Sequence, residues 1–135
     1  MKSLGINKVM HDKILRWAIC SKREINFVCL GKGNQILKVV RLRNPEKFGR
    51  YTASINNREF REVLRTHPEL KVIACGHSHI GGPARPSRGD MPPTIAMGKI
   101  ELIACTKSRT LTAWRIKKDL SSTLRKGKLL LNTYN

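Results

Sequence analysis

Acidic and aromatic side chains are scarce in this sequence, and their scarcity narrows the classes of partner. Nine Asp and Glu residues stand against 27 Lys and Arg residues, so the 135-residue chain has a formal charge of +18. A field of that sign attracts nucleic acid, an anionic membrane or an acidic protein. Only two aromatic residues, Tyr51 and Trp114, lie close to basic clusters where they could stack on bases. Their small number argues against a nucleic-acid partner.

Long apolar runs and paired cysteines are absent as well. The sequence has no run of about 18 apolar residues, the length of a membrane-spanning helix, and its first residues lack the apolar block of a signal peptide. We therefore expect a cytoplasmic protein without a membrane partner. The four cysteines lie far apart and form no Cys-x-x-Cys pair, which favours packed free thiols over a disulfide framework.

The order of patterns along the chain predicts a single α/β domain. Apolar residues at helical spacing predict helices over 8–19 and 54–70. Apolar runs bounded by turn residues predict strands at 25–34, 35–43, 70–80, 99–107 and 109–118. Helices mixed with hairpins favour a central mixed sheet. We expect this domain to occupy residues 1–117 and to be followed by a basic C-terminal tail over 118–135.

Two of the four histidines and one of the nine acidic residues fall within one short stretch. His77 and His79 lie two residues apart at the end of a predicted strand, so their side chains project to the same face. A Gly- and Pro-rich loop follows and could return Asp90 to them. Three such ligands leave one position of a tetrahedral zinc open, which is typical of a catalytic site. Glu24 is the candidate for the carboxylate base, and Ser87 is either a helix cap or a donor to an oxyanion.

These residues resemble the signature of the JAMM (MPN+) family of zinc metalloproteases. The stretch HSHIGGPARPSRGD, residues 77–90, is similar to the family's metal motif, which reads His-x-His, seven residues, Ser, two residues, Asp. Upstream, Glu24 stands seven residues before Gly31, as the glutamate does in the family's Glu-x-Cys-Gly-Leu-Leu-x-Gly segment. The chain departs from the family pattern at Ile80, where a proline is usual, and at 26–27, where Cys-Gly is usual.

The resemblance covers roughly residues 5–117 and implies both a fold and a reaction. The implied fold is a cytidine-deaminase-like (JAMM/MPN) mixed β-sheet flanked by helices. The implied reaction is hydrolysis of the isopeptide or peptide bond after the C-terminal glycine of ubiquitin or a ubiquitin-like modifier, whose conjugates would be the substrates. Residues 44–54 would correspond to the insert that pairs with the extended tail of such a substrate.

The resemblance also implies a role for each residue of the site. His77, His79 and Asp90 would be the ligands of Zn2+. Glu24 would be the general acid/base for the attacking water, and Ser87 would stabilise the oxyanion. Cys75 precedes the first histidine by two residues, and we interpret it as a packed thiol because a further ligand would close the open position of the metal.

Several alternatives stay open at this point. Some relatives process a sulfur-carrier protein of similar shape, and the same site would suit that reaction. A non-catalytic MPN-like scaffold or a basic nucleic-acid-binding module is the alternative from another class, although the intact ligand set and the few stacking aromatics speak against them. Relatives often work as dimers, so a homodimer is also open.

Overall fold

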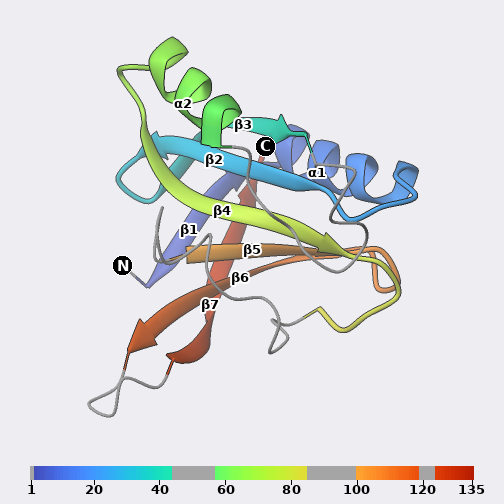
Figure 1. The fold of residues 1–135 in the computed structure, drawn as a ribbon. Coiled ribbons are helices and arrows are strands. Elements are labelled where there is room, and N and C mark those ends of the chain that lie inside the picture. Colours follow the sequence, from blue (N-terminus) through green and yellow to red (C-terminus); the bar gives the residue numbers. More distant parts are fainter. Residues whose placement is uncertain (1, 44–56, 85–99, 119–123) are drawn as a thin grey trace.

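One closed mixed sheet and two helices make up the parts of the chain that the computed structural model describes, residues 2–43, 57–84, 100–118 and 124–135 (Figure 1). The helices are α1, Lys8–Cys20, and α2, Asn57–Thr66. The strands are β1 Ser3–Asn7, β2 Asn26–Lys32, β3 Gln35–Leu42, β4 Lys71–His79, β5 Ile100–Cys105, β6 Thr110–Lys118 and β7 Leu124–Tyr134. Their order in the sheet is β1-β3-β2-β4-β5-β6-β7, and β7 pairs with β1. The predicted class, a mixed sheet with helices, is confirmed.

Both hairpins that the sequence predicts are present. β2 and β3 pair in antiparallel fashion, and Gly33 at their turn has a φ of 58°, in the left-handed region that favours glycine. β5 and β6 also pair in antiparallel fashion, through a turn over 106–109 in which Arg109 has a φ of 55°. The two hairpins lie on either side of β4, which pairs with β2 and with β5.

Helix α1 matches its predicted range and begins at a side-chain cap. The Asn7 side chain accepts a hydrogen bond of 2.7 Å from the backbone N–H of Val9, which satisfies one of the free donors at the helix start. Ile14 and Ala18 lie one turn apart and are fully buried in the larger core cluster. Val9, which the apolar pattern places near the same face, is 74% exposed. The buried line of the helix therefore follows the i, i+4 spacing of residues 14 and 18.

Helix α2 covers the other face of the sheet. Phe60 and Val63 are buried in a second core cluster with Val28 of β2, Leu42 of β3 and Cys75 of β4. Adjacent residues of β2 alternate between the two clusters, because successive side chains of a strand point to opposite faces. The sheet is thus covered by α1 on one face and by α2 on the other.

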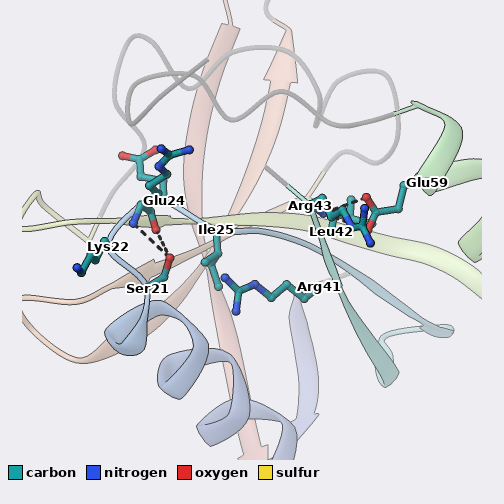
Figure 2. Close-up of a pocket in the computed structure, with 9 residues that line it drawn as sticks. Ser21, Lys22, Glu24, Ile25, Arg41, Leu42, Arg43 and Glu59 are labelled. Atoms are coloured by element: carbon teal, nitrogen blue, oxygen red, sulfur yellow. Dashed lines mark hydrogen bonds between the residues drawn. The ribbon is translucent and has the colours of Figure 1, made fainter. Parts of the chain in front are cut away.

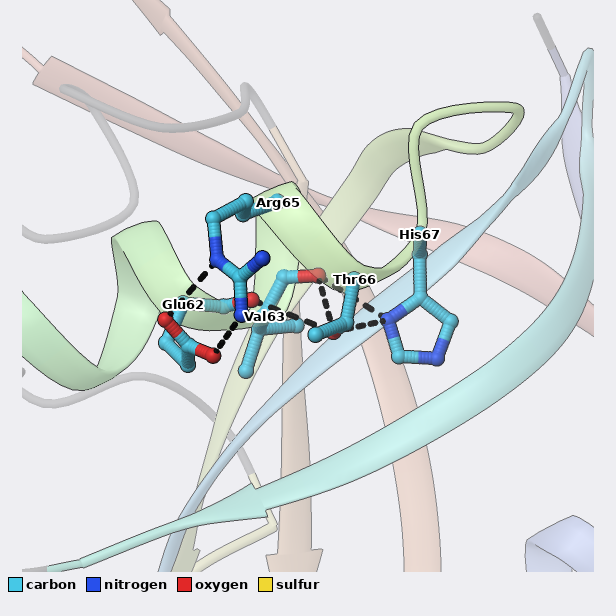
Figure 3. Close-up of polar contacts among 5 residues, drawn as sticks. All are labelled: Glu62, Val63, Arg65, Thr66 and His67. Atoms are coloured by element: carbon cyan, nitrogen blue, oxygen red, sulfur yellow. Dashed lines mark hydrogen bonds and ion pairs between the residues drawn. The ribbon is translucent and has the colours of Figure 1, made fainter.

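Polar contacts hold the end of α2, as Figure 3 shows. Arg65 pairs with Glu62, its Nε donating at 3.1 Å. The Thr66 hydroxyl donates to the backbone oxygens of Glu62 and Val63, and Nδ1 of His67 lies 2.9 Å from the backbone oxygen of Val63. These contacts satisfy carbonyl groups that the last helical turn leaves free. His67 therefore caps the C-terminal end of α2.

The two ends of the chain contribute strands that the sequence patterns did not predict. β7, Leu124–Tyr134, lies where we expected a basic tail, and it pairs with β6 on one side and with β1 on the other. Leu129 is 7% exposed in the core, whereas its neighbour Leu130 is 63% exposed. β1, Ser3–Asn7, is buried at Leu4 and Ile6. Each strand supplies the partner that the other needs to close the sheet.

Strand β4 carries the histidines, and its packing is tight near the site. Gly76 lies against the ring of Phe27 on β2, so that a Cβ at this glycine would come within 2.1 Å of the ring. Only a residue without a side chain fits there.

Neither helix of the described ranges is long and apolar enough to cross a membrane.

Candidate metal centre

The two histidines converge at the end of β4, as their spacing predicts. His77 is 7% exposed and His79 is 6% exposed, and their Nε2 atoms lie 3.1 Å apart. Their rings are tilted by 54° with centroids 5.0 Å apart. Two imidazole nitrogens held about 2.0–2.1 Å from a tetrahedral zinc lie about 3.3–3.4 Å from each other. The observed separation is close to the one that a shared zinc ion requires.

The other ring nitrogen of each histidine faces an oxygen atom. Nδ1 of His77 lies 3.4 Å from Oε1 of Glu101, which is only 1% exposed, and Nδ1 of His79 lies 2.8 Å from the backbone oxygen of Pro83. An oxygen acceptor favours the tautomer in which Nδ1 carries the proton. In that tautomer Nε2 is the ring nitrogen left to bind a metal. An oxygen acceptor beside Nδ1 is the usual further contact of a histidine that binds a metal.

Glu24 is brought to the same end of the sheet by the pairing of β2 with β4. The antiparallel register aligns Asn26 with His77. One residue further, Ser78 continues this pairing, because its N–H donates to the backbone oxygen of Ile25 and its hydroxyl accepts from the N–H of Ile25 at 2.8 Å. Glu24 lies two residues before β2, in the segment that enters the strand from α1, at the end of the sheet where His77 and His79 finish β4.

A cleft of about 820 Å3 opens beside Glu24. Residues 21–25, which connect α1 to β2, form one wall, residues 41–43 at the end of β3 form another, and Glu59 of α2 completes the lining (Figure 2). The first wall is braced by Ser21, whose hydroxyl donates to the backbone oxygen of Arg23 at 2.7 Å. Glu24, which the sequence nominates as acid/base, is one of the residues that line this cleft, whereas His77 and His79 lie outside its lining.

The described residues supply two of the three predicted ligands. Ser87, Asp90 and the expected insert over 44–54 lie outside the described residues. Among the described residues, no three His, Cys, Asp or Glu side chains come together as a metal site. His77 and His79 fit zinc in donor type and in the separation of their nitrogens, and the position of a third ligand stays a prediction.

Cys75 does not belong to this ligand set. It is 3% exposed, packs in the cluster beneath α2, and burial raises the pKa of its thiol to about 12. A thiol in this environment keeps its proton, whereas a metal binds the thiolate. The interpretation of Cys75 as a packed thiol is confirmed. All four cysteines are free, and Cys20 alone among them is exposed.

The comparison with family models identifies the fold. Residues 8–117 match the model of prokaryotic homologs of the JAB domain. The chain belongs to this JAB/MPN family. The family includes the JAMM metalloproteases, so the resemblance stated from the histidine motif is confirmed. None of the curated proteins compared with the chain matches it in sequence.

Solved structures agree with the JAB/MPN fold. A solution structure of a protein from Desulfitobacterium hafniense superposes with a TM-score of 0.76 at 20% identity, covering 97% of this chain and 94% of that one. A JAB1/MPN domain protein from Archaeoglobus fulgidus superposes with a TM-score of 0.60 at 16% identity, covering 99% of this chain and 100% of that one. A structure reported as "JAMM: A Metalloprotease-like Zinc Site in the Proteasome and Signalosome" superposes with a TM-score of 0.58 at 18% identity, covering 98% of each chain. These likenesses show the fold of this JAB domain.

Glu101 is the site residue that sequence reasoning missed. It stands in the apolar run KIELIACTK, where the pattern predicts a buried strand. An acidic residue within such a run is unusual, because a buried carboxylate needs a polar partner. That signal was available in the sequence, but its partner was not. β5 pairs with β4 in parallel and aligns Ile103 with His77, which brings Glu101 onto the face of the histidines.

Proposed function

We propose that this JAB domain is a zinc-dependent isopeptidase or peptidase, which hydrolyses the bond after the C-terminal glycine of ubiquitin or a ubiquitin-like modifier. The observation that carries the proposal is the convergence of the Nε2 atoms of His77 and His79, 3.1 Å apart, with both Nδ1 atoms turned to oxygen acceptors. A pair of histidines prepared in this way is suited to a metal. Membership of a family that includes the JAMM metalloproteases makes zinc the metal to test first.

Each residue has a defined part in the proposed reaction. His77 and His79 would hold Zn2+ through their Nε2 atoms, and Asp90 would be the third ligand by the family motif. Zinc, when bound, polarises the substrate carbonyl and acidifies a water molecule. Glu24 accepts a proton from the attacking water and later delivers it to the leaving amine, as a general base and then a general acid. Ser87 donates a hydrogen bond to the oxygen of the tetrahedral intermediate.

The proposal is tested by cleavage of a panel of fusions, in which ubiquitin or another ubiquitin-like protein is joined through its C-terminal glycine to a reporter. We expect cleavage of at least one fusion, its loss when a chelator removes the metal, and its recovery when zinc is added. Glu24→Gln should lower kcat by at least about a hundredfold, because the amide cannot take up the proton. A panel left intact by the zinc-loaded protein would contradict the proposal.

Processing of a sulfur-carrier protein is the alternative within the same chemistry. Such a substrate presents a similar glycine tail to the same residues, so a carrier protein fused to a reporter belongs in the panel. A non-catalytic scaffold and a nucleic-acid-binding module are the alternatives from another class. Binding of an oligonucleotide that falls steeply with salt, in a protein that cleaves nothing with zinc, would favour the binding module.

A further inference from the structure

The turn that follows β4 is held by the neighbouring β5–β6 hairpin (Figure 1). Gly81 has a φ of 69°, in the left-handed region that favours glycine. A Cβ at Gly82 would lie 3.5 Å from Cβ of His79, so the turn brings the chain back against this histidine. Thr106 fixes the start of the turn. Its N–H donates to the backbone oxygen of His79 at 3.1 Å, and its hydroxyl accepts from the N–H of Gly81 at 3.2 Å.

The three residues after this turn, 82–84, form a strap whose backbone oxygens all have side-chain partners. In chain order, these oxygens contact the Cys105 thiol at 2.9 Å, Nδ1 of His79 at 2.8 Å and the Thr112 hydroxyl at 2.7 Å. Cys105 belongs to β5 and Thr112 to β6. The oxygen that faces His79 therefore lies between two oxygens that the hairpin holds.

The hydroxyl of Thr112 is oriented by a second side chain of the same strand. Nε1 of Trp114 donates to Oγ1 of Thr112 at 2.9 Å, and residues two apart on a strand share one face. A hydroxyl that accepts from an indole keeps one hydrogen to donate. The backbone oxygen of Ala84 lies 2.7 Å from Oγ1, against 3.5 Å for that of Ile103. The shorter distance assigns the hydrogen to the strap.

The register of the sheet brings Thr112 to the face that carries the histidines. β6 aligns Thr112 with Ile103 of β5, and β5 aligns Ile103 with His77 of β4. Aligned residues of neighbouring strands project to the same face. Thr112 therefore acts on the metal centre from two strands away, through the strap.

We propose that Thr112, oriented by Trp114, is a positioning residue of the metal centre. Its hydroxyl fixes the strap, and the backbone oxygen of Pro83 then keeps the proton of His79 on Nδ1, which leaves Nε2 for the metal. A carbonyl oxygen only accepts, so its contact with Nδ1 requires a proton on that nitrogen. The proposal rests on the proposed function for the identity of the metal, zinc, and not for the tautomer.

The tautomer of His79 in the metal-free protein is the first readout, because it reports the strap without metal or cleavage. Long-range proton–nitrogen correlation spectra at about pH 8.5 separate the two neutral tautomers of imidazole. Thr112→Val removes the hydroxyl at nearly the same volume. It should lower the ratio of the Nδ1–H to the Nε2–H tautomer at His79 at least about threefold, because the hydrogen bond to the strap is weakened. His67, whose Nδ1 lies 2.9 Å from the backbone oxygen of Val63, is the control within each spectrum and should keep its ratio.

Zinc affinity is the second readout, measured by competition with a chromophoric chelator. Thr112→Val should weaken zinc binding at least about fivefold, since contacts that orient metal-binding histidines contribute to metal affinity. Thr112→Ser keeps the hydroxyl and should return both readouts to within about twofold of the wild type. Thr133→Val is the matched control: it makes the same change at an exposed position of β7 and should alter neither readout.

Trp114→Phe tests the second link of the chain of hydrogen bonds. It removes the indole N–H and should shift both readouts in the same direction as Thr112→Val but by less, because the hydroxyl remains without the donor that orients it. Trp17→Phe changes the other tryptophan, which lies on α1 with Nζ of Lys13 5.2 Å from its ring centroid, and should alter neither readout. Far-ultraviolet circular dichroism and thermal unfolding check that each variant is folded.

The results separate this proposal from the proposed function. An unchanged tautomer ratio or an unchanged zinc affinity in Thr112→Val overturns the positioning role, as does a loss that Thr112→Ser fails to restore. Should Thr112→Val not fold, Trp114→Phe decides by the same two readouts. If no fusion is cleaved with zinc but Thr112→Val shifts the ratio and weakens zinc binding, the proposed function fails and the positioning role stands.

Discussion

At the scale of single residues, the candidate metal centre depends on side chains that orient other side chains. His77 and His79 present Nε2 to a common point because Glu101 and the backbone oxygen of Pro83 face the opposite nitrogen of each ring. Ser78 connects the same strand to the segment that holds Glu24, through two hydrogen bonds with Ile25. The chemistry of the site therefore extends one layer beyond the residues of the family motif.

Glu101→Gln should weaken zinc binding by about tenfold, because it removes the charge of a buried carboxylate that lies 3.4 Å from Nδ1 of His77. The measurement is competition for zinc with a chromophoric chelator. Glu62→Gln is the matched control: it removes the same charge from the exposed surface of α2, where Glu62 pairs with Arg65, and should leave zinc affinity unchanged. An unaltered affinity in Glu101→Gln would show that Glu101 has no part in positioning His77.

At the scale of secondary-structure elements, the site depends on how closely β4 packs against β2. The register between them aligns Phe27 with Gly76 and Asn26 with His77. The ring of Phe27 lies over the glycine, so one aromatic side chain fills the space that a larger residue at position 76 would occupy. This packing lies next to His77, which meets Glu101 of β5.

Gly76→Ala should lower the free energy of unfolding by about 1–3 kcal/mol, because its Cβ would overlap the ring of Phe27. Urea denaturation measures the change. Gly127→Ala is the control, since a Cβ at Gly127 meets no atom within 4 Å, and its effect should stay within about 0.5 kcal/mol. Adding Phe27→Leu to Gly76→Ala should cost less than the two single changes combined, because the overlap disappears. Strict additivity of the two changes would argue against the overlap.

At the scale of the whole molecule, the two ends of the chain close the sheet. β7 pairs along one side with β6 and along the other with β1 (Figure 1). The C-terminal strand therefore closes the sheet against the N-terminal strand. A sheet without this strand would leave two edges exposed, and such edges favour association with other chains. The C-terminal residues of β7 are therefore part of the folded structure.

Leu129→Ala should lower the free energy of unfolding by about 2–4 kcal/mol, because it leaves a cavity in the core beneath β7. Leu130→Ala should change it by less than about 0.5 kcal/mol, since the adjacent side chain is 63% exposed. The two variants are compared by urea denaturation of the full chain. If both changes were equally neutral, residues 118–135 would behave as a tail in solution.

The sequence by itself determined the elements with local signals and the pair of histidines. Helical spacing located α1, the Gly33 turn located the β2–β3 hairpin, and the two-residue spacing of His77 and His79 on a strand was enough to place both on one face. These features depend on neighbours in the chain, so a pattern of a few residues reports them. The family motif extended this prediction to zinc and to Glu24.

Only the tertiary structure decided which distant residues meet. β1 is short and β7 is strongly basic. Each pairs with the edge strand that the other provides, and neither segment alone specifies that partner. Glu101 reaches His77 because β5 aligns in parallel with β4. Such contacts join residues far apart in sequence, and they are determined by the burial and hydrogen bonding of the complete sheet.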